Sequence, residues 1–245
     1  MNDLFHAFET EEVLAKKKEL RPHQSEAIRL IRQSYGKANR RIVVGMPTGA
    51  GKTLTATKII EGALAKGNRV IFTAPAISLI DQTVEAFEAE GISGIGVMQA
   101  NHPRTDSYAR VQVASVQTLA RREIPEAALV IVDECHLRAK VIEKLMEERS
   151  DVFFIGLSAT PWAKGMGLLW QDLVTPCTIQ DLIDNGSLSQ FRVFAPDIPD
   201  MSGVKTIAGD FHEGQTAEVM EGKALMASVV DTWLERDITL AVVNL

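Results

Sequence analysis

Short apolar runs alternate with helical patterns along most of the chain. Residues 41–46 (RIVVGM) form an apolar run rich in β-branched side chains, which predicts a buried strand. Residues 51–66 have the apolar spacing of a helix, and Gly67 supplies its end. The alternation continues with a predicted strand over 69–74 and a helix over 78–90. Further strands are predicted over residues 94–98, 111–116, 129–132 and 153–157.

Strands that are apolar on both faces and separated by helices are typical of a parallel sheet covered on both sides. We therefore predict an α/β fold with a doubly wound, mainly parallel sheet and helices on both faces. A helix over 20–33, with Pro22 in its first turn, precedes the first strand. After Pro161 the pattern weakens to a short helix over 178–185 and a strand over 190–195.

The last fifty residues differ in composition from the rest. Residues 196–222 contain six acidic side chains against one basic side chain, together with Gly and Pro, which indicates a linker or a long surface excursion. Residues 223–245 return to a helical pattern and end in a strand-like run. The prediction is a first domain over 1–195, an acidic linker over 196–222, and the start of a truncated or absent second domain over 223–245.

The composition excludes several classes of protein. With 46% hydrophobic and 24% charged residues, wholesale disorder is excluded. No apolar run approaches the ~18 residues of a membrane-spanning helix, so no membrane partner is expected. Cys135 and Cys177 are the only cysteines, which excludes a disulfide framework and favours a cytoplasmic location. The net charge is −6, but acids and bases are equal in number over residues 1–195, so charge neither indicates nor excludes a nucleic-acid partner.

A glycine-rich segment, PTGAGKT, lies between the first predicted strand and the helix that follows it. Such glycines let backbone N–H groups approach phosphate oxygens, and the helix N-terminus adds positive potential. We expect Lys52 to reach the β- and γ-phosphates of a nucleotide, and the Thr53 hydroxyl to ligate Mg²⁺. Met46 stands where the strict pattern has glycine, and the alternative interpretation is a glycine-rich turn with an exposed lysine. The predicted nucleotide-binding residues of this segment are Pro47, Thr48, Gly49, Ala50, Gly51, Lys52 and Thr53.

Two acids follow the predicted strand over 129–132, at the end where open parallel sheets bind their ligands. Asp133 is predicted to hold Mg²⁺, directly or through water. Glu134 is predicted to polarise the attacking water as a general base. The alternative is a pair of solvated acids at a strand end. His136, beside them, is either structural or a hydrogen-bonding link between the nucleotide and a neighbouring loop.

Taken together, these residues resemble a known set of motifs. Residues 47–53, Asp133-Glu134-Cys135-His136 and Ser158-Ala159-Thr160 resemble motifs I, II and III of superfamily 2 helicases, with motif II in the DExH form. The Met46 departure agrees with the resemblance, because this superfamily commonly lacks the first glycine. Residues 20–24 (LRPHQ) resemble the segment that reads adenine, which implies a base contact by Gln24 with Arg21 nearby; an ordinary helix start is the alternative.

The resemblance covers about residues 20–161, and the chain looks most like the phage and bacterial group that includes type III restriction helicase subunits. It implies nucleic-acid contacts in a segment resembling motif Ia and in a later strand-loop motif, where hydroxyl and N–H groups hold phosphates without reading bases. The implied contact residues are Thr73, Pro75, Gln82, Ser115 and Thr118. Ser158 and Thr160 are implied to couple the nucleotide site to the nucleic acid, although a simple strand-end turn is the alternative. We expect Trp162 to pack rather than to stack on a base.

By resemblance, the chain is the first RecA-like domain of an ATP-dependent helicase or translocase, with ATP and Mg²⁺ as cofactors and DNA or RNA as partner. It contains no stretch like the arginine motif of a second RecA-like domain. Such arginines are worth about 10³–10⁵ in rate in related systems. We therefore expect weak turnover from this chain alone and a second RecA-like domain in cis or in trans. Two alternatives stay open: a nucleotide-switched nucleic-acid-binding module without hydrolysis, and a P-loop ATPase unrelated to nucleic acid.

Overall fold

The computed structural model describes residues 18–99, 101–191, 199–207 and 210–220. The chain divides into two compact units, Met1–Ser189 and Gln190–Leu245. The predicted start of a second domain over 223–245 lies outside the described residues, as does most of the predicted strand over 190–195.

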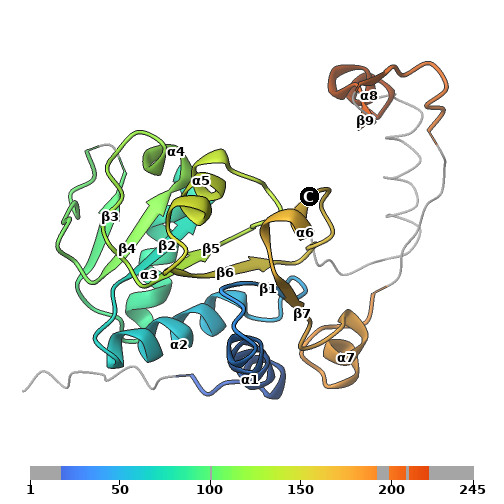
Figure 1. Ribbon diagram of the computed structural model, residues 1–245. Helices are drawn as coiled ribbons and strands as arrows, with labels where there is room; N and C mark the ends of the chain where they lie inside the picture. The colour runs from blue at the N-terminus through green and yellow to red at the C-terminus, as the bar shows by residue number, and fades with distance from the viewer. Residues whose placement is uncertain (1–17, 100, 192–198, 208–209, 221–245) are drawn as a thin grey trace, which may run out of the picture. The chain divides into compact units, whose positions relative to one another are not determined.

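A seven-stranded sheet forms the centre of the first unit (Figure 1), and all of its neighbouring strands run parallel. The order across the sheet is β3-β4-β2-β5-β6-β1-β7. The strands are β1 Arg41–Gly45, β2 Val70–Ala74, β3 Ile95–Met98, β4 Val111–Ser115, β5 Leu129–Val132, β6 Phe153–Ser158 and β7 Asp172–Val174. This confirms the predicted parallel α/β fold. Among the seven strands of this sheet, β7 alone is not predicted from the sequence. Its three residues are too short a run to be recognised as a strand.

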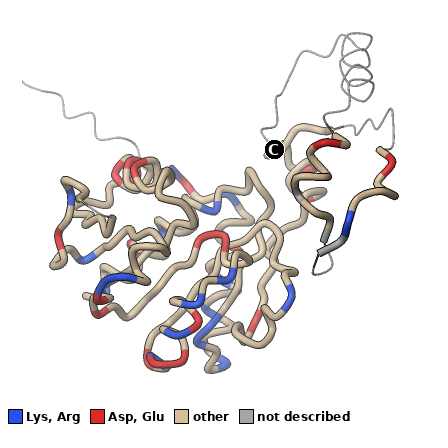
Figure 2. Tube along the Cα trace, turned by 90° about the horizontal axis from the view of Figure 1, so that it is seen from above, with Lys and Arg blue, Asp and Glu red and all other residues tan. Residues whose placement is uncertain are grey.

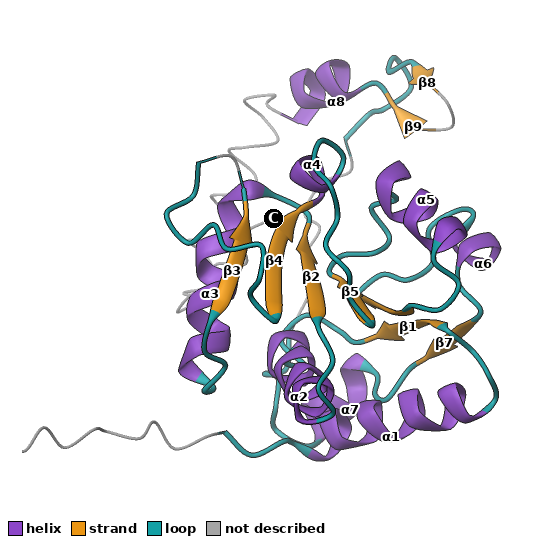
Figure 3. Ribbon diagram, turned by 60° about the vertical axis from the view of Figure 1, so that its left-hand side comes forward, coloured by secondary structure: helices purple, strands orange, loops and turns teal. Residues whose placement is uncertain are grey.

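Helices cover both faces of the sheet (Figure 3). One face is covered by α1 Pro22–Gly36, α2 Lys52–Ala65 and α3 Ile80–Ala89. The other is covered by α4 Val116–Leu119, α5 Lys140–Glu148 and α6 Met166–Leu169. A 3₁₀ turn, Ile77–Leu79, precedes α3, and α7 spans Ile179–Asp184. The doubly wound arrangement is therefore confirmed.

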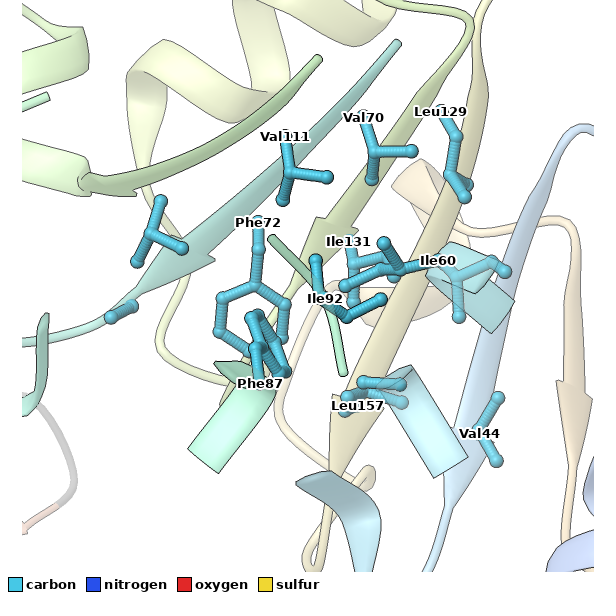
Figure 4. Close-up of a cluster of buried hydrophobic side chains, with 14 of the residues drawn as sticks. Val44, Ile60, Val70, Phe72, Phe87, Ile92, Val111, Leu129, Ile131 and Leu157 are labelled. Carbon is cyan, nitrogen blue, oxygen red and sulfur yellow. The ribbon is translucent and has the colours of Figure 1, made fainter. Parts of the chain in front are cut away.

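The two faces of the sheet carry separate clusters of buried side chains. On the face covered by α1 to α3, Phe72 of β2 meets Phe87 of α3 edge to face, with ring centroids 5.0 Å apart (Figure 4). On the other face, Phe154 of β6 is fully buried. Burial of each such side chain contributes roughly 1.5–3 kcal/mol to the stability of the folded state. The strands are thus held on both sides, which fixes the loops at their carboxyl ends.

The second unit is described over short stretches only. Its strands β8 Thr206–Ile207 and β9 Asp210–Phe211 pair antiparallel, and α8 spans Glu213–Met220. Short regular elements therefore occur within the stretch predicted as a linker. None of the helices in the described part of the chain has the length and apolar character needed to cross a membrane.

Candidate active site

The glycine-rich loop between β1 and α2 has an unusual backbone. Gly49 and Gly51 both have a φ of +81°, in the left-handed region that disfavours side chains. Space gives a second reason for glycine at both positions. A Cβ on Gly49 would lie 2.7 Å from Leu188 Cδ2, and one on Gly51 would lie 2.1 Å from Gln24 Nε2. A loop with such left-handed residues, leading into a helix, forms a concavity of N–H groups suited to an anion.

Lys52 starts α2 and lies beside an acid from the other side of the site. Its Nζ is 3.2 Å from Oε1 of Glu134, and both side chains are largely buried. Thr53, next along the helix, is exposed. The two segments that the sequence predicts to hold a nucleotide and its metal are thus adjacent in the structure.

Strand order explains this meeting. β6 lies between β5, which leads to Asp133, and β1, which leads to the glycine-rich loop. Beyond the strands, Cys135 N donates to Leu157 O at 3.0 Å, and Met46 N donates to Ser158 O at 2.9 Å. Backbone hydrogen bonds therefore join the segments that follow the carboxyl ends of β5 and β1 to the end of β6.

His136 links the acids to the end of β6. Its Nδ1 lies 2.9 Å from Ser158 Oγ and 3.3 Å from Glu134 Oε2. The buried Ser158 Oγ also accepts a hydrogen bond from Thr160 N at 3.0 Å. The structure thus joins four predicted site residues, Glu134, His136, Ser158 and Thr160, by a continuous series of polar contacts.

Glu134 has a strained backbone. Its φ of +45° lies in the left-handed region, although it is not glycine. This conformation costs roughly 1–2 kcal/mol for an L-residue. Such strain persists where the surroundings impose it, and it is concentrated at functional sites.

Burial and the neighbouring Glu134 raise the pKa of Asp133 above its ordinary value. An ionised Asp133 is therefore costly unless a cation lies close to it. The carboxylate of Asp133 and the hydroxyl of Thr53 are the hard oxygen donors that Mg²⁺ prefers, so these residues fit that ion. Burial also raises the pKa of Cys135 to about 12, which leaves this thiol protonated and a poor nucleophile.

The segment predicted to read adenine is bound to the glycine-rich loop. The buried Gln24 donates from Nε2 to Ala50 O at 3.1 Å and to Gly51 O at 3.3 Å, and its Oε1 accepts from Arg21 N at 2.9 Å. His23 Nε2 lies 2.9 Å from Ala50 O. The proximity of His23 to the loop is not signalled by the sequence. An adenine contact by Gln24 stays a prediction, and its carboxamide already has three backbone partners.

Four of the five predicted nucleic-acid residues lie at the ends of β2 and β4, which are neighbours in the sheet, and the fifth, Gln82, lies in α3. Thr73, Ser115 and Thr118 are buried, and Ser115 Oγ lies 2.9 Å from Thr118 Oγ1. Pro75 is half-buried and Gln82 is exposed. The backbone N–H of Thr118 donates to Ser115 Oγ at 3.2 Å, and Thr73 lies within a strand that is paired on both sides, so phosphate contacts at these buried positions stay a prediction.

Surface charge does not mark a nucleic-acid face. Acidic and basic residues are interspersed over the first unit (Figure 2). Arg104 pairs with Glu88, and Arg110 donates to Leu64 O at 2.6 Å. The expectation that Trp162 packs is wrong, because its side chain is 74% exposed. It lies in a turn after Pro161.

The parallel sheet, the glycine-rich loop after β1 and the acids after β5 define a RecA-like domain of the superfamily 2 helicase class. The family model described as type III restriction enzyme, res subunit, matches residues 17–163. The chain belongs to this family.

Similar proteins of known sequence come from phages and restriction systems. A 51.5 kDa protein of Lactococcus phage (isolate 7-9) is 25% identical over 199 residues, which are 79% of this chain and 41% of that protein. The type I restriction enzyme EcoKI endonuclease subunit of Escherichia coli (strain K12) is 29% identical over 147 residues, 53% of this chain and 12% of that subunit. This chain therefore spans less than half the length of these relatives.

Solved structures share the fold. The UvsW helicase of bacteriophage T4 superposes with a TM-score of 0.56 at 22% identity, over 65% of this chain and 61% of that one. A nuclease-deletion mutant of the type ISP restriction-modification enzyme LlaGI, in complex with a DNA substrate mimic, gives 0.53 at 18% identity, over 69% and 21% of the two chains. At these identities the likeness establishes the architecture alone.

Proposed function

We propose that this chain binds ATP with Mg²⁺ and couples ATP hydrolysis to movement on nucleic acid, as the first of two RecA-like domains. The observation that carries the proposal is the ion pair between Lys52 and Glu134, 3.2 Å apart across the site. It supports one compact site in which a phosphate-binding loop faces a general base.

Each residue then has a role. The loop 47–51 and Lys52 hold the β- and γ-phosphates, and Lys52 leaves Glu134 to do so. Thr53 and Asp133 hold Mg²⁺, which neutralises charge on the phosphates when bound. Glu134, once released from Lys52, accepts a proton from the attacking water. Ser158, bound by His136, relays the state of the site toward Thr160.

DNA is the nucleic acid that the comparisons favour, and RNA is compatible with the same contacts. LlaGI was captured with a DNA substrate mimic, and the type ISP enzyme LlaBIII bound to DNA also shares the fold, with a TM-score of 0.56 at 17% identity. The loops after β2 and β4 would hold phosphates through backbone N–H groups, which do not depend on sequence.

A second RecA-like domain, in cis or in trans, completes the proposal. The arginines of such a domain stabilise charge on the transferred phosphoryl group. We therefore expect this chain to bind ATP but to turn it over slowly without that partner.

Calorimetry with ATP and Mg²⁺ tests the nucleotide site, and the anisotropy of a fluorescein-labelled oligonucleotide tests the nucleic-acid site. We expect saturable ATP binding that is at least tenfold weaker in Lys52→Ala. We also expect oligonucleotide binding to weaken as salt rises from 50 to 200 mM, because phosphate contacts release counterions. A correctly folded chain that gives no heat with ATP would refute the proposal.

A further inference from the structure

A cavity of about 210 Å³ lies on the α5 face of the sheet, beside motif II. The buried residues that line it are mostly apolar, among them Ile142, Met146 and Trp170. No residue of the glycine-rich loop lines it, so it is distinct from the proposed nucleotide site. Asp133 is the one residue that the two sites share.

The cavity is lined in part by the two loops proposed to hold nucleic acid, through Pro75 after β2 and through Val116 and Gln117 after β4. Gln117, which is exposed, lines the cavity and donates from Nε2 to Pro75 O at 3.2 Å, so the loops after β2 and β4 are joined there. A strand held by these loops would therefore pass the cavity.

The size and chemistry of the cavity define its ligand. An apolar cavity of about 150 Å³ in another protein binds benzene, so the space here accommodates one aromatic ring with polar substituents. The carboxylate of Asp133 accepts hydrogen bonds when ionised, and the Oε1 of Gln117 is an acceptor. Arg138 and Glu143 also line the cavity but pair with each other at 2.7 Å, so the net charge of the walls is that of the Asp133 carboxylate, which repels a phosphate group. A planar ring with N–H donors on its edge fits these walls, and a nucleic-acid backbone does not.

We infer that this cavity receives one base of the bound nucleic-acid strand, turned out of the strand at the loops after β2 and β4. The inference rests on the proposed function, because it assumes that a strand crosses these loops. A base in the cavity would touch Asp133, which the proposed metal also touches. Strand binding and nucleotide binding would then meet at a single carboxylate.

The test uses the full chain and a single-stranded oligonucleotide that carries one 2-aminopurine, whose emission responds to its surroundings and whose amine is the required donor. Anisotropy of the same strand with a fluorescein label measures binding separately. We expect the emission to change at least twofold on binding, and this change to be lost in Ile142→Phe, which fills the cavity. Ile124→Phe is the matched control, because Ile124 lines two neighbouring cavities and not this one.

Circular dichroism checks that Ile142→Phe folds, and Val116→Phe fills the same cavity from α4 if it does not. An emission change that persists in a folded filled variant would overturn the inference. Strand binding without any emission change in the unaltered chain would overturn it too, and would leave the proposed function intact. A chain that binds no strand would overturn both.

Discussion

Lys52 Nζ lies 3.2 Å from Glu134 Oε1, so the lysine after the glycine-rich loop and the second acid of motif II neutralise each other. In the proposed site, this ion pair competes with the contact of Lys52 with the phosphates and with the contact of Glu134 with water. Under the proposed function, a triphosphate that draws Lys52 toward its oxygens would release Glu134, and the carboxylate would become free to accept a proton. The pair would then link nucleotide binding to exposure of the general base.

Substitution of either partner should separate binding from turnover. Lys52→Ala removes a charged contact to the phosphates, worth about 1.5–3 kcal/mol, so ATP affinity should fall at least tenfold. Glu134→Gln keeps the shape but removes the base, so ATP should still bind while the hydrolysis rate falls by about 10²–10⁴. Calorimetry and phosphate release measure the two effects.

The matched controls are Lys66→Ala and Glu147→Gln, on the exposed surface of the same unit. Both should behave as the unaltered chain does. Equal ATP affinity in Lys52→Ala and Lys66→Ala would count against the proposed role of the pair.

A second prediction concerns the packing of Leu188 against Gly49. Gly49→Ala combines a left-handed φ with a Cβ 2.7 Å from Leu188 Cδ2. Gly67→Ala has nearly the same φ, +82°, but open space around its Cβ. Gly67→Ala should therefore lower the free energy of unfolding by about 1–2 kcal/mol, and Gly49→Ala should lower it further.

Urea unfolding of a double-mutant cycle isolates the contact. Leu188→Ala, added to Gly49→Ala, should recover stability relative to the sum of the single effects, with a coupling of about 0.5–3 kcal/mol. Strict additivity would show that the backbone strain alone accounts for the loss.

Most of the fold is readable from the sequence because its strands are buried on both faces. The apolar runs that form β1, β2, β5 and β6 are typical of strands in a parallel sheet, which is covered by helices on both faces. The edge strand β7 is different: its three residues are positioned by pairing with β1, a tertiary contact that local pattern cannot reveal.

The site was partly predictable for a similar reason. The loop before Lys52 and the acids after β5 are each a short run of residues directly after an apolar strand, so the sequence shows both. The strand order then brings the two segments together. The contacts of His23 and Leu188 with the loop depend on how α1 and the segment after α7 dock, so no local signal marks them. For Trp162 the prediction itself was wrong. We expected this aromatic side chain to pack, but it is exposed in the structure.

A third prediction follows from the raised pKa of Asp133. In the native state this carboxyl holds its proton to a higher pH than in the unfolded chain, because of burial and then Glu134. Native-state stability therefore falls as the pH rises through the native pKa. The variant Asp133→Asn has no carboxyl group to titrate at this position. Its gain in stability over the unaltered chain should therefore be absent at low pH and reach its maximum above the native pKa of Asp133.

Thermal unfolding without nucleotide, followed from pH 4 to pH 8, measures this difference. At neutral pH we expect Asp133→Asn to have a higher Tm than the unaltered chain, and the difference to disappear at the acid end of the range. Added ATP and Mg²⁺ should then stabilise the unaltered chain and not the variant. Asp184→Asn, at an exposed aspartate, is the control. A variant less stable than the unaltered chain at neutral pH would contradict the prediction.

A fourth prediction decides what Gln24 does. Its Nε2 donates to Ala50 O and Gly51 O, and its Oε1 accepts from Arg21 N, so the carboxamide supports the phosphate-binding loop. Gln24→Ala removes these hydrogen bonds, although Ala50 O keeps His23 and Gly51 O keeps Thr55 as partners, so the loss of stability should be about 0.5–1.5 kcal/mol. If support of the loop is its main role, the affinities for ATP and GTP should fall by the same factor, because both nucleotides present the same phosphates.

Competition binding with ATP and GTP measures that factor, and Gln33→Ala, an exposed glutamine on the same helix, is the control. A base contact would give a different result: ATP affinity would fall while GTP affinity stayed constant, since only adenine would lose a hydrogen bond. Equal losses would assign Gln24 to the loop and leave the choice of base to other residues. A selective loss for ATP would show that the carboxamide exchanges its backbone partners for adenine when the nucleotide binds.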